Sequence, residues 1–239
     1  MQCAILAGGV ATRMRPLTET VPKALLEVAG QPFAHWQLRW LASQGVTDVV
    51  YCVAYLGDQV RAYVGDGTAW GLRVRYADEG EALRGTAGAL AHAARLGLLD
   101  ERFLVLYGDS YLDVVVGDVW AAHAAHGLAM LISVYKNDGA FDGSNVRYRH
   151  GLVERYEKGL ADPAAAGMHH IDYGLSVVQR SALLDAVDDG GVAHDLASWQ
   201  HELSLGGQLA GFEAFHRFYE IGSPQGLAEL ETHLTRSPT

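Results

Sequence analysis

Residues 5–30 read ILAGGVATRMRPLTETVPKALLEVAG, and this stretch places two adjacent glycines directly behind a short apolar run. Three cations follow, Arg13, Arg15 and Lys23. In an α/β sheet, ligands bind beyond the carboxyl ends of the strands, and the loop after the first strand is the usual phosphate-binding loop. Glycine lets backbone N–H groups approach a phosphate, and arginine adds charge-assisted hydrogen bonds. The stretch therefore predicts a strand and an anion-binding loop, although a tight turn with a solvated basic loop stays open for these residues alone.

The composition indicates a globular protein and argues against a general nucleic-acid binder. A chain of 239 residues with 49% hydrophobic residues is long enough for one large core, so we expect a single domain over residues 1–239. The formal charge of −10 argues against nucleic-acid binding, because a phosphate backbone is attracted by a broad basic surface. Cys3 and Cys52 are too few for a disulfide framework, which suits a reducing compartment. The first residues lead directly into an apolar run, so we expect no membrane segment and a cytoplasmic location.

Short apolar runs alternate with helical patterns through residues 1–135. The predicted strands are Cys3–Leu6, Val49–Val53, Val74–Tyr76, Phe103–Leu106 and Leu128–Val134. The predicted helices are Phe33–Ser43, Gly57–Val64, Thr86–Arg95 and Val119–His126. Such alternation is typical of βαβ units and predicts a mostly parallel sheet.

The pattern changes in residues 136–239. The predicted strand-like segments are Asn145–His150, Leu152–Tyr156 and His170–Val178. Two closing helices are predicted over Val192–Leu205 and Pro224–Leu234. The second begins after Ser223 as N-cap, because serine caps helices well and proline is favoured at the first helical position. We interpret this part as a small β-rich elaboration on the substrate side of the core.

The segment LAGGVATRMRPLT, Leu6–Thr18, together with Pro22 and Lys23, resembles the signature LAGGxGTRLxPLT…PKP of sugar-1-phosphate nucleotidyltransferases, also called NDP-sugar pyrophosphorylases. The chain departs from the signature at Ala11, where the family has glycine, and at Ala24, where it has proline. Four further segments resemble family motifs in the same order. They are GDS at 108–110, EKG at 157–159, IDYGLSV at 171–177 and FYEIGSPQG at 218–226.

The resemblance implies a Rossmann-like three-layer α/β/α nucleotidyltransferase fold with a mainly parallel central sheet and a small β-rich sugar-binding part. Residues 1–135 would form the nucleotide-binding core, and residues 136–239 the sugar-binding part with the closing helices. The implied reaction joins a nucleoside triphosphate to a sugar 1-phosphate and releases pyrophosphate. The catalytic residues implied are Arg13, Lys23 and Asp109. Asp109 and Glu220 would hold Mg²⁺, a hard cation that favours carboxylate and phosphate oxygens.

The resemblance also assigns binding residues. Nucleotide binding is expected at Leu6, Ala7, Gly8, Gly9, Thr12, Arg13, Glu81, Gly85 and Thr86. Binding of the sugar phosphate is expected at Gly108, Asn145, Glu157, Lys158, Asp172 and Gly174. A carboxylate at Glu81 would accept both guanine N1–H and N2–H₂, which favours GTP over the other triphosphates. The segments are most similar to the compact heptose-1-phosphate guanylyltransferases, with heptose or hexose 1-phosphates as the expected acceptors.

Several alternatives stay open. N-acetylmuramate-1-phosphate uridylyltransferases are close competitors, and a non-catalytic nucleotide-binding regulatory homologue is the main alternative outside enzymes. A molybdenum-cofactor guanylyltransferase shares the LAGG opening only. A dinucleotide-dependent dehydrogenase is disfavoured because the GxGxxG spacing is absent. The sequence gives no role to His123 and His126 or to His169 and His170, and it leaves a homo-oligomer open.

Overall fold

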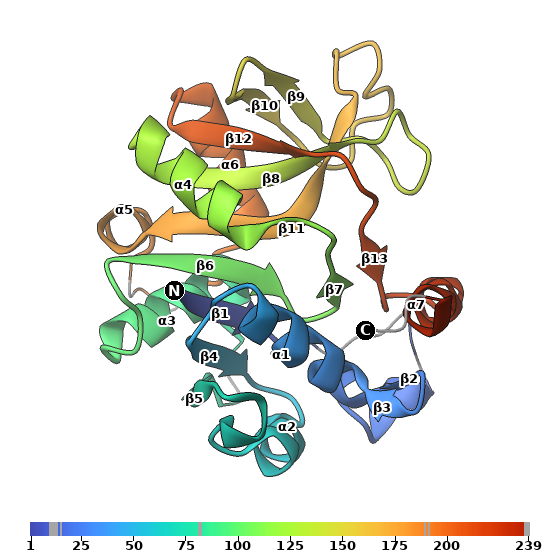
Figure 1. The fold of residues 1–239 in the computed structure, drawn as a ribbon. Coiled ribbons are helices and arrows are strands. Elements are labelled where there is room, and N and C mark those ends of the chain that lie inside the picture. The colour runs from blue at the N-terminus through green and yellow to red at the C-terminus, as the bar shows by residue number, and fades with distance from the viewer. Residues whose placement is uncertain (10–13, 15, 81–82, 189, 191, 237–239) are drawn as a thin grey trace.

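The computed structural model describes residues 1–9, 14, 16–80, 83–188, 190 and 192–236. Its centre is a nine-stranded sheet in the order β5-β4-β1-β6-β11-β8-β12-β10-β9 (Figure 1). The strands are β1 (Gln2–Leu6), β4 (Asp48–Val53), β5 (Arg73–Asp78), β6 (Arg102–Tyr107), β8 (Met130–Lys136), β9 (Val146–Arg149), β10 (Leu152–Tyr156), β11 (His170–Gln179) and β12 (Leu209–Ala214). All eight strand segments expected from the apolar runs are present.

The sheet is mixed, so the expectation of a mainly parallel sheet is wrong for its second half. Strands β5, β4, β1 and β6 are parallel, as βαβ units require. Strand β11 then lies antiparallel to both β6 and β8, and only β8 and β12 restore a parallel pair. The connection from β8 to β11 contains the antiparallel pair β9 and β10. Parallel neighbours need a crossover connection, usually a helix, whereas antiparallel neighbours do not. The replacement of helical crossovers by this antiparallel pair therefore accounts for the antiparallel direction of β11.

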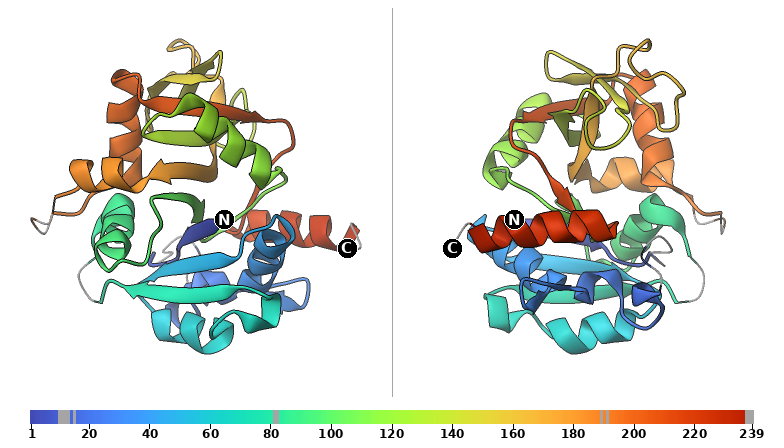
Figure 2. Two further views of the ribbon diagram at one scale, coloured as in Figure 1. Left: turned by 60° about the vertical axis from the view of Figure 1, so that its left-hand side comes forward. Right: turned by 90° about the vertical axis from the view of Figure 1, so that its right-hand side faces the viewer.

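Helices cover both faces of the sheet, which gives the expected three layers (Figure 2). One face packs against α1 (Phe33–Ser43), α2 (Gly57–Val64) and α4 (Val116–His126). The other face packs against α3 (Gly85–Arg95), α5 (Arg180–Ala186) and α6 (Leu196–Leu205). Successive residues of a strand point to opposite faces, so Cys3 and Ile5 lie in the first core and Ala4 lies in the second.

The last helix, α7 (Pro224–Arg236), lies beside a small hairpin of β2 (Glu27–Val28) and β3 (Gln31–Pro32). Val28, Phe33, Ile221 and Leu230 form a separate apolar cluster between them. The N–H of Gly226 donates to Ser223 Oγ at 3.0 Å, which confirms Ser223 as the cap of this helix.

The remaining elements are short. They are the strands β7 (Ser110–Tyr111) and β13 (Tyr219–Glu220) and the 3₁₀ turns η2 (Leu17–Glu19), η3 (Lys23–Leu25) and η4 (Thr68–Trp70). Strands β7 and β13 pair antiparallel beside the carboxyl end of β6. Within the part of the chain that the structure describes, no helix combines the length and the apolar character needed to span a membrane.

Candidate active site

A pocket of about 270 Å³ lies at the carboxyl ends of the parallel strands, where an α/β sheet binds its ligands. The loop after β1 forms one wall through Leu6, Ala7, Gly8 and Gly9. The start of α3 forms another through Gly85, Thr86 and Ala89. The end of β6 contributes Tyr107, Gly108 and Asp109. Six of the nine residues predicted for nucleotide binding therefore line one cavity.

The other three, Thr12, Arg13 and Glu81, lie outside the described residues, as does Arg15. Arg13 was also predicted to be catalytic, so this role stays a prediction.

The loop after β1 uses glycine for close approach. Neither Gly8 nor Gly9 has a positive φ, so the left-handed freedom of glycine is not what this loop requires. A Cβ on Gly8 would lie 3.0 Å from Glu79 Oε1 and 3.3 Å from the Cβ of Ala54. A larger residue would therefore push the loop away from the floor of the pocket.

Lys23 and Asp109 meet at the pocket mouth. Lys23 begins η3 directly after Pro22, and Asp109 follows β6. Lys23 Nζ lies 2.8 Å from Asp109 Oδ2, and the two side chains are 21% and 29% exposed. The pair places a flexible cation and a carboxylate where a phosphate ligand would enter. Because the ion pair is partly exposed, water weakens it, and we expect substrate binding to separate Lys23 from Asp109.

Asp109 also lies beside Glu220. The pairing of β7 with β13 sets Ser110 opposite Glu220, and the N–H of Ile221 donates to the carbonyl of Asp109 at 3.0 Å. The Glu220 side chain reaches solvent, yet the surrounding protein together with the carboxylates of Asp109 and Asp142 raises its pKa to about 7. Lys23 opposes this shift. A carboxylate whose charge is destabilised by neighbouring carboxylates is a suitable site for a cation.

The donors fit Mg²⁺, which is usually bound by one or two carboxylates with water and substrate phosphates completing its shell. Among the described residues no group of three or more His, Cys, Asp or Glu side chains converges on one point. Asp109 and Glu220 would therefore supply the protein ligands, and the phosphates would supply the rest.

Glu79 is a pocket residue that sequence reasoning missed. It directly follows β5, is 9% exposed, and accepts the N–H of Arg84 on Oε2 at 2.9 Å. Burial raises its pKa, and the Arg84 N–H opposes the shift. The alternation of β5 was the available signal, because Glu79 falls on the same face as the buried Ala77.

Five of the six residues predicted for the sugar phosphate form a second cluster, whereas the sixth, Gly108, lines the pocket. The N–H of Asp172 donates to Asn145 Oδ1 at 3.0 Å, and the N–H of Glu157 donates to the Asn145 carbonyl at 2.9 Å. The N–H of Gly174 donates to Asp172 Oδ1 at 3.0 Å. Burial raises the pKa of Asp172, and Lys158 opposes this. The structure thus brings together Asn145, Glu157, Lys158, Asp172 and Gly174.

Sequence reasoning missed several partners in this cluster. Asp172 Oδ2 accepts hydrogen bonds from Tyr156 Oη at 3.4 Å and from Gln200 Nε2 at 3.3 Å. The Nε of Arg155 donates to Glu157 Oε2 at 2.8 Å. Glu157 therefore reaches any substrate with its charge already partly neutralised.

Tyr107 connects the two parts of the site. It lines the pocket, and its ring lies 3.6 Å from the position of a Cβ on Gly174 in the sugar cluster. Burial raises the pKa of Tyr107 well above its usual value, and the carboxylates of Asp172 and Asp109 raise it further. Tyr107 thus stays protonated and offers a hydrogen-bond donor among acidic side chains.

The second half of the chain reaches the pocket through Asp195, which precedes α6. The N–H of Leu196 donates to Thr86 Oγ1 at 2.7 Å, and the N–H of Ala87 donates to the His194 carbonyl at 2.9 Å. These bonds join the starts of α3 and α6. Thr86 therefore lines the pocket and caps a helix 110 residues away in the sequence.

In this α/β fold, the glycines after β1, Lys23 and the acids Glu79 and Asp109 line one pocket at the carboxyl ends of the strands. A family profile for nucleotidyl transferases matches residues 3–161. The chain belongs to this nucleotidyl transferase family.

Similar proteins carry more specific descriptions. N-acetylmuramate alpha-1-phosphate uridylyltransferase of Neisseria meningitidis serogroup B is 44% identical over 114 residues, which are 48% of this chain and 49% of that protein. Mannose-1-phosphate guanyltransferase of Aspergillus fumigatus is 34% identical over 185 residues, 77% of this chain and 50% of that protein. The chain thus spans about half the length of these curated relatives.

Solved structures share the fold. A putative glucose-1-phosphate thymidylyltransferase from Bacillus anthracis superposes with a TM-score of 0.84 at 18% identity, covering 100% of this chain and 96% of that one. This likeness confirms the α/β nucleotidyltransferase fold expected from the sequence.

Proposed function

We propose that the protein transfers a nucleotidyl group from a nucleoside triphosphate, with GTP favoured, to a sugar 1-phosphate. The products are an NDP-sugar and pyrophosphate. The observation that carries the proposal is the Lys23–Asp109 pair, which lies in the pocket mouth on the same β6 end as Tyr107. A nucleotide in the pocket and a sugar phosphate on the Asp172 cluster would meet at this pair.

In the proposed reaction, an oxygen of the sugar 1-phosphate attacks the α-phosphorus of the triphosphate. The new P–O bond forms as the bond to the oxygen bridging the α- and β-phosphorus atoms breaks, and pyrophosphate leaves with that electron pair. Positioning and charge neutralisation supply most of the rate in phosphoryl transfer. Lys23 would hold the α-phosphate or the attacking oxygen, and Arg13 would grip the leaving pyrophosphate. Mg²⁺ held by Asp109 and Glu220 would neutralise the negative charge of the phosphates.

The sugar phosphate would be bound by Lys158, with the hydroxyls on Glu157 and Asp172. A carboxylate is an acceptor-only group when ionised, which suits a polyol. Asn145 orders the two acids through its side-chain and backbone oxygens. Tyr107 adds a donor between this cluster and the nucleotide pocket.

The preference for GTP rests on a buried acid in the pocket. Guanine presents N1–H and N2–H₂ side by side, so a carboxylate can accept from both, whereas uracil and thymine present N3–H alone. Glu79 would supply this carboxylate, since it lines the cavity and its Oε1 faces the loop at Gly8. Glu81, the acid expected from the sequence, stays a prediction.

A uridylyltransferase acting on an amino-sugar 1-phosphate such as N-acetylmuramate 1-phosphate is the second candidate. The 44% identity to the Neisseria uridylyltransferase favours it. A non-catalytic regulatory role is disfavoured, because such a protein has no need of Lys23 and Asp109 in contact at a pocket mouth.

The test is pyrophosphate release with Mg²⁺, using the five common nucleoside triphosphates against hexose-, amino-sugar- and heptose-1-phosphates. Turnover with GTP and a heptose or hexose 1-phosphate is the expected result. Turnover with UTP and an amino sugar would select the second candidate. Silence across the panel, from folded protein that binds a nucleotide, would favour the regulatory reading.

A further inference from the structure

Gln37 is a buried polar residue of α1 that none of the roles above uses. Its side chain is 0% exposed. Its Nε2 donates to the carbonyl of Tyr107 and to the carbonyl of Ser110, both at 3.0 Å. One side-chain amide thus holds the backbone on either side of Gly108 and Asp109.

The orientation of this amide follows from its two partners. An amide nitrogen carries two hydrogens and can serve two carbonyls, whereas an amide oxygen in the same place would face two other oxygens. Gln37 Oε1 consequently points away, and it has no hydrogen-bond partner among the described residues. A buried acceptor without a hydrogen-bond partner destabilises the fold. The favourable contribution of the Gln37 amide therefore comes from its two hydrogen bonds to the carbonyls of Tyr107 and Ser110.

The held segment carries the proposed metal ligand. Two backbone bonds fix it from other directions: the Gly108 N–H donates to the Leu6 carbonyl, and the Ile221 N–H donates to the Asp109 carbonyl, each at 3.0 Å. A Cβ on Gly108 would lie 2.5 Å from the Leu6 carbonyl oxygen, which shows how closely the segment lies on β1. Gln37 adds a constraint from the layer of helices.

We propose that Gln37 is a positioning residue for the divalent cation, because it fixes the turn that carries the Asp109 carboxylate. The proposal rests on the proposed function for the identity of the cation site. Groups that orient metal ligands typically change metal affinity by about 10- to 100-fold when removed. Gln37 acts through the backbone, so we expect an effect of about 10-fold, at the lower end of that range.

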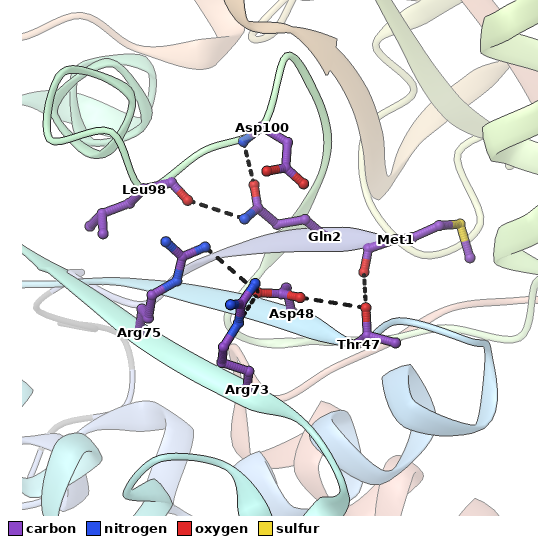
Figure 3. Close-up of polar contacts among 8 residues, drawn as sticks. All are labelled: Met1, Gln2, Thr47, Asp48, Arg73, Arg75, Leu98 and Asp100. Atoms are coloured by element: carbon purple, nitrogen blue, oxygen red, sulfur yellow. Dashed lines mark hydrogen bonds and ion pairs between the residues drawn. The ribbon is translucent and has the colours of Figure 1, made fainter.

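The chain offers a matched control in Gln2, a second buried glutamine that bridges backbone groups (Figure 3). Gln2 Nε2 donates to the Leu98 carbonyl at 3.1 Å, and Gln2 Oε1 accepts the Asp100 N–H at 2.7 Å. Gln2 lies at the amino end of β1, whereas the site lies beyond its carboxyl end. Replacing Gln2 therefore removes the same kind of contact away from the metal site.

The experiment compares Gln37→Met with Gln2→Met in the whole chain. Methionine has a similar length and no donor. Mn²⁺ binding is measured by electron paramagnetic resonance with GTP present and no sugar phosphate, and the Mg²⁺ dependence of turnover is measured separately. Gln37→Met should raise the Mn²⁺ dissociation constant and the half-saturating Mg²⁺ concentration by about 10-fold. Gln2→Met should lower the unfolding temperature but leave both metal values within twofold of the wild type.

Equal metal binding by wild type and folded Gln37→Met would overturn the proposal, and so would an equal loss in both variants. If Gln37→Met does not fold, Gln37→Asn keeps the amide but shortens its reach by one methylene, and the same shift is expected. Failure of both Gln37 variants to fold would assign the residue to stability and also overturn it. A wild type without turnover would refute the proposed function, while the Mn²⁺ comparison would still decide the role of Gln37.

Discussion

Glu79 is the residue through which base selection is most directly tested. Glu79→Gln keeps the size of the side chain but replaces one acceptor with a donor, which suits the N3–H and adjacent carbonyl of uracil or thymine. A bidentate base contact is worth about 1–3 kcal/mol of discrimination. The ratio of kcat/KM for GTP to that for UTP should therefore fall by about 10-fold or more. Steady-state pyrophosphate release measures it, with Asp78→Asn, the exposed neighbour, as control.

A ratio unchanged in Glu79→Gln would remove Glu79 from base reading. Glu81, the acid chosen from the sequence, lies outside the described residues, so its role stays a prediction. Asp78, Glu79 and Glu81 fall within four positions, and composition does not distinguish them. Which of Asp78 and Glu79 enters the pocket depends on where β5 ends and on which face of the strand continues into the pocket. The register of a strand is set by tertiary packing.

The raised pKa of Glu79 also predicts a pH dependence of stability. A carboxyl whose folded-state pKa lies above its unfolded value stabilises the fold below the unfolded pKa, and this contribution is lost as pH rises through the folded pKa. Glutamine carries no charge, so Glu79→Gln should gain stability relative to wild type as pH increases from 4 to 8. Urea unfolding across this range measures the difference. A difference that stays constant with pH would contradict ionisation of a buried Glu79.

Lys23 is the cation that the structure places against Asp109, and its removal should affect chemistry more than folding. Removal of one electrostatic stabiliser typically lowers kcat by about 10²-fold or more. We expect a loss of this size for Lys23→Met, with little change in the unfolding midpoint because the ion pair is partly exposed. Lys136→Met, at an exposed lysine paired with Asp138, is the control. Full activity in Lys23→Met would exclude Lys23 from the mechanism.

At the scale of elements, the start of α6 depends on a contact that the local sequence does not contain. The helix was expected from Val192 but begins at Leu196, where Thr86 supplies the capping oxygen from α3. Loss of a capping hydroxyl costs about 1 kcal/mol. Thr86→Val should therefore lower the free energy of unfolding by about 1 kcal/mol, and Thr86→Ser should retain the wild-type value. Urea melts of both variants measure this, and equal stability of Thr86→Val and Thr86→Ser would contradict the cap.

Other elements were predictable to different degrees for physical reasons. Helices α1 and α2 have the expected bounds, because their apolar residues recur at three and four positions and glycine or proline marks their edges. Strand β12, LAGFEA, was not expected, since the adjacent small residues Ala210 and Gly211 weaken its pattern and its place in the sheet comes from pairing with β8. Helix α5 has seven residues and follows β11 directly, so it is too short for periodicity to reveal.

At the scale of the whole molecule, the site joins parts of the chain that sequence motifs identify but do not place. The GDS and YEIG segments are far apart in the sequence and pair as β7 and β13. The family motifs predicted that Asp109 and Glu220 act together. No sequence motif predicted the antiparallel direction of β11, the strand that carries Asp172. Strand direction depends on how the connections cross the sheet, and the motifs do not contain this information.

The proposed metal ligands are Asp109, which follows β6, and Glu220 in β13, so ligand binding should stabilise the whole fold in a metal-dependent way. A ligand at 100 times its dissociation constant stabilises the folded state by about 2.7 kcal/mol. GTP with Mg²⁺ should therefore raise the unfolding temperature of the wild type more than GTP alone. Asp109→Asn removes one of the two carboxylates and should abolish the additional increase due to Mg²⁺. Asp113→Asn, at an exposed acid paired with His216, should keep it. Thermal unfolding with and without Mg²⁺ measures these shifts, and the same Mg²⁺-dependent increase in Asp109→Asn and wild type would refute the assignment of Asp109 as a metal ligand.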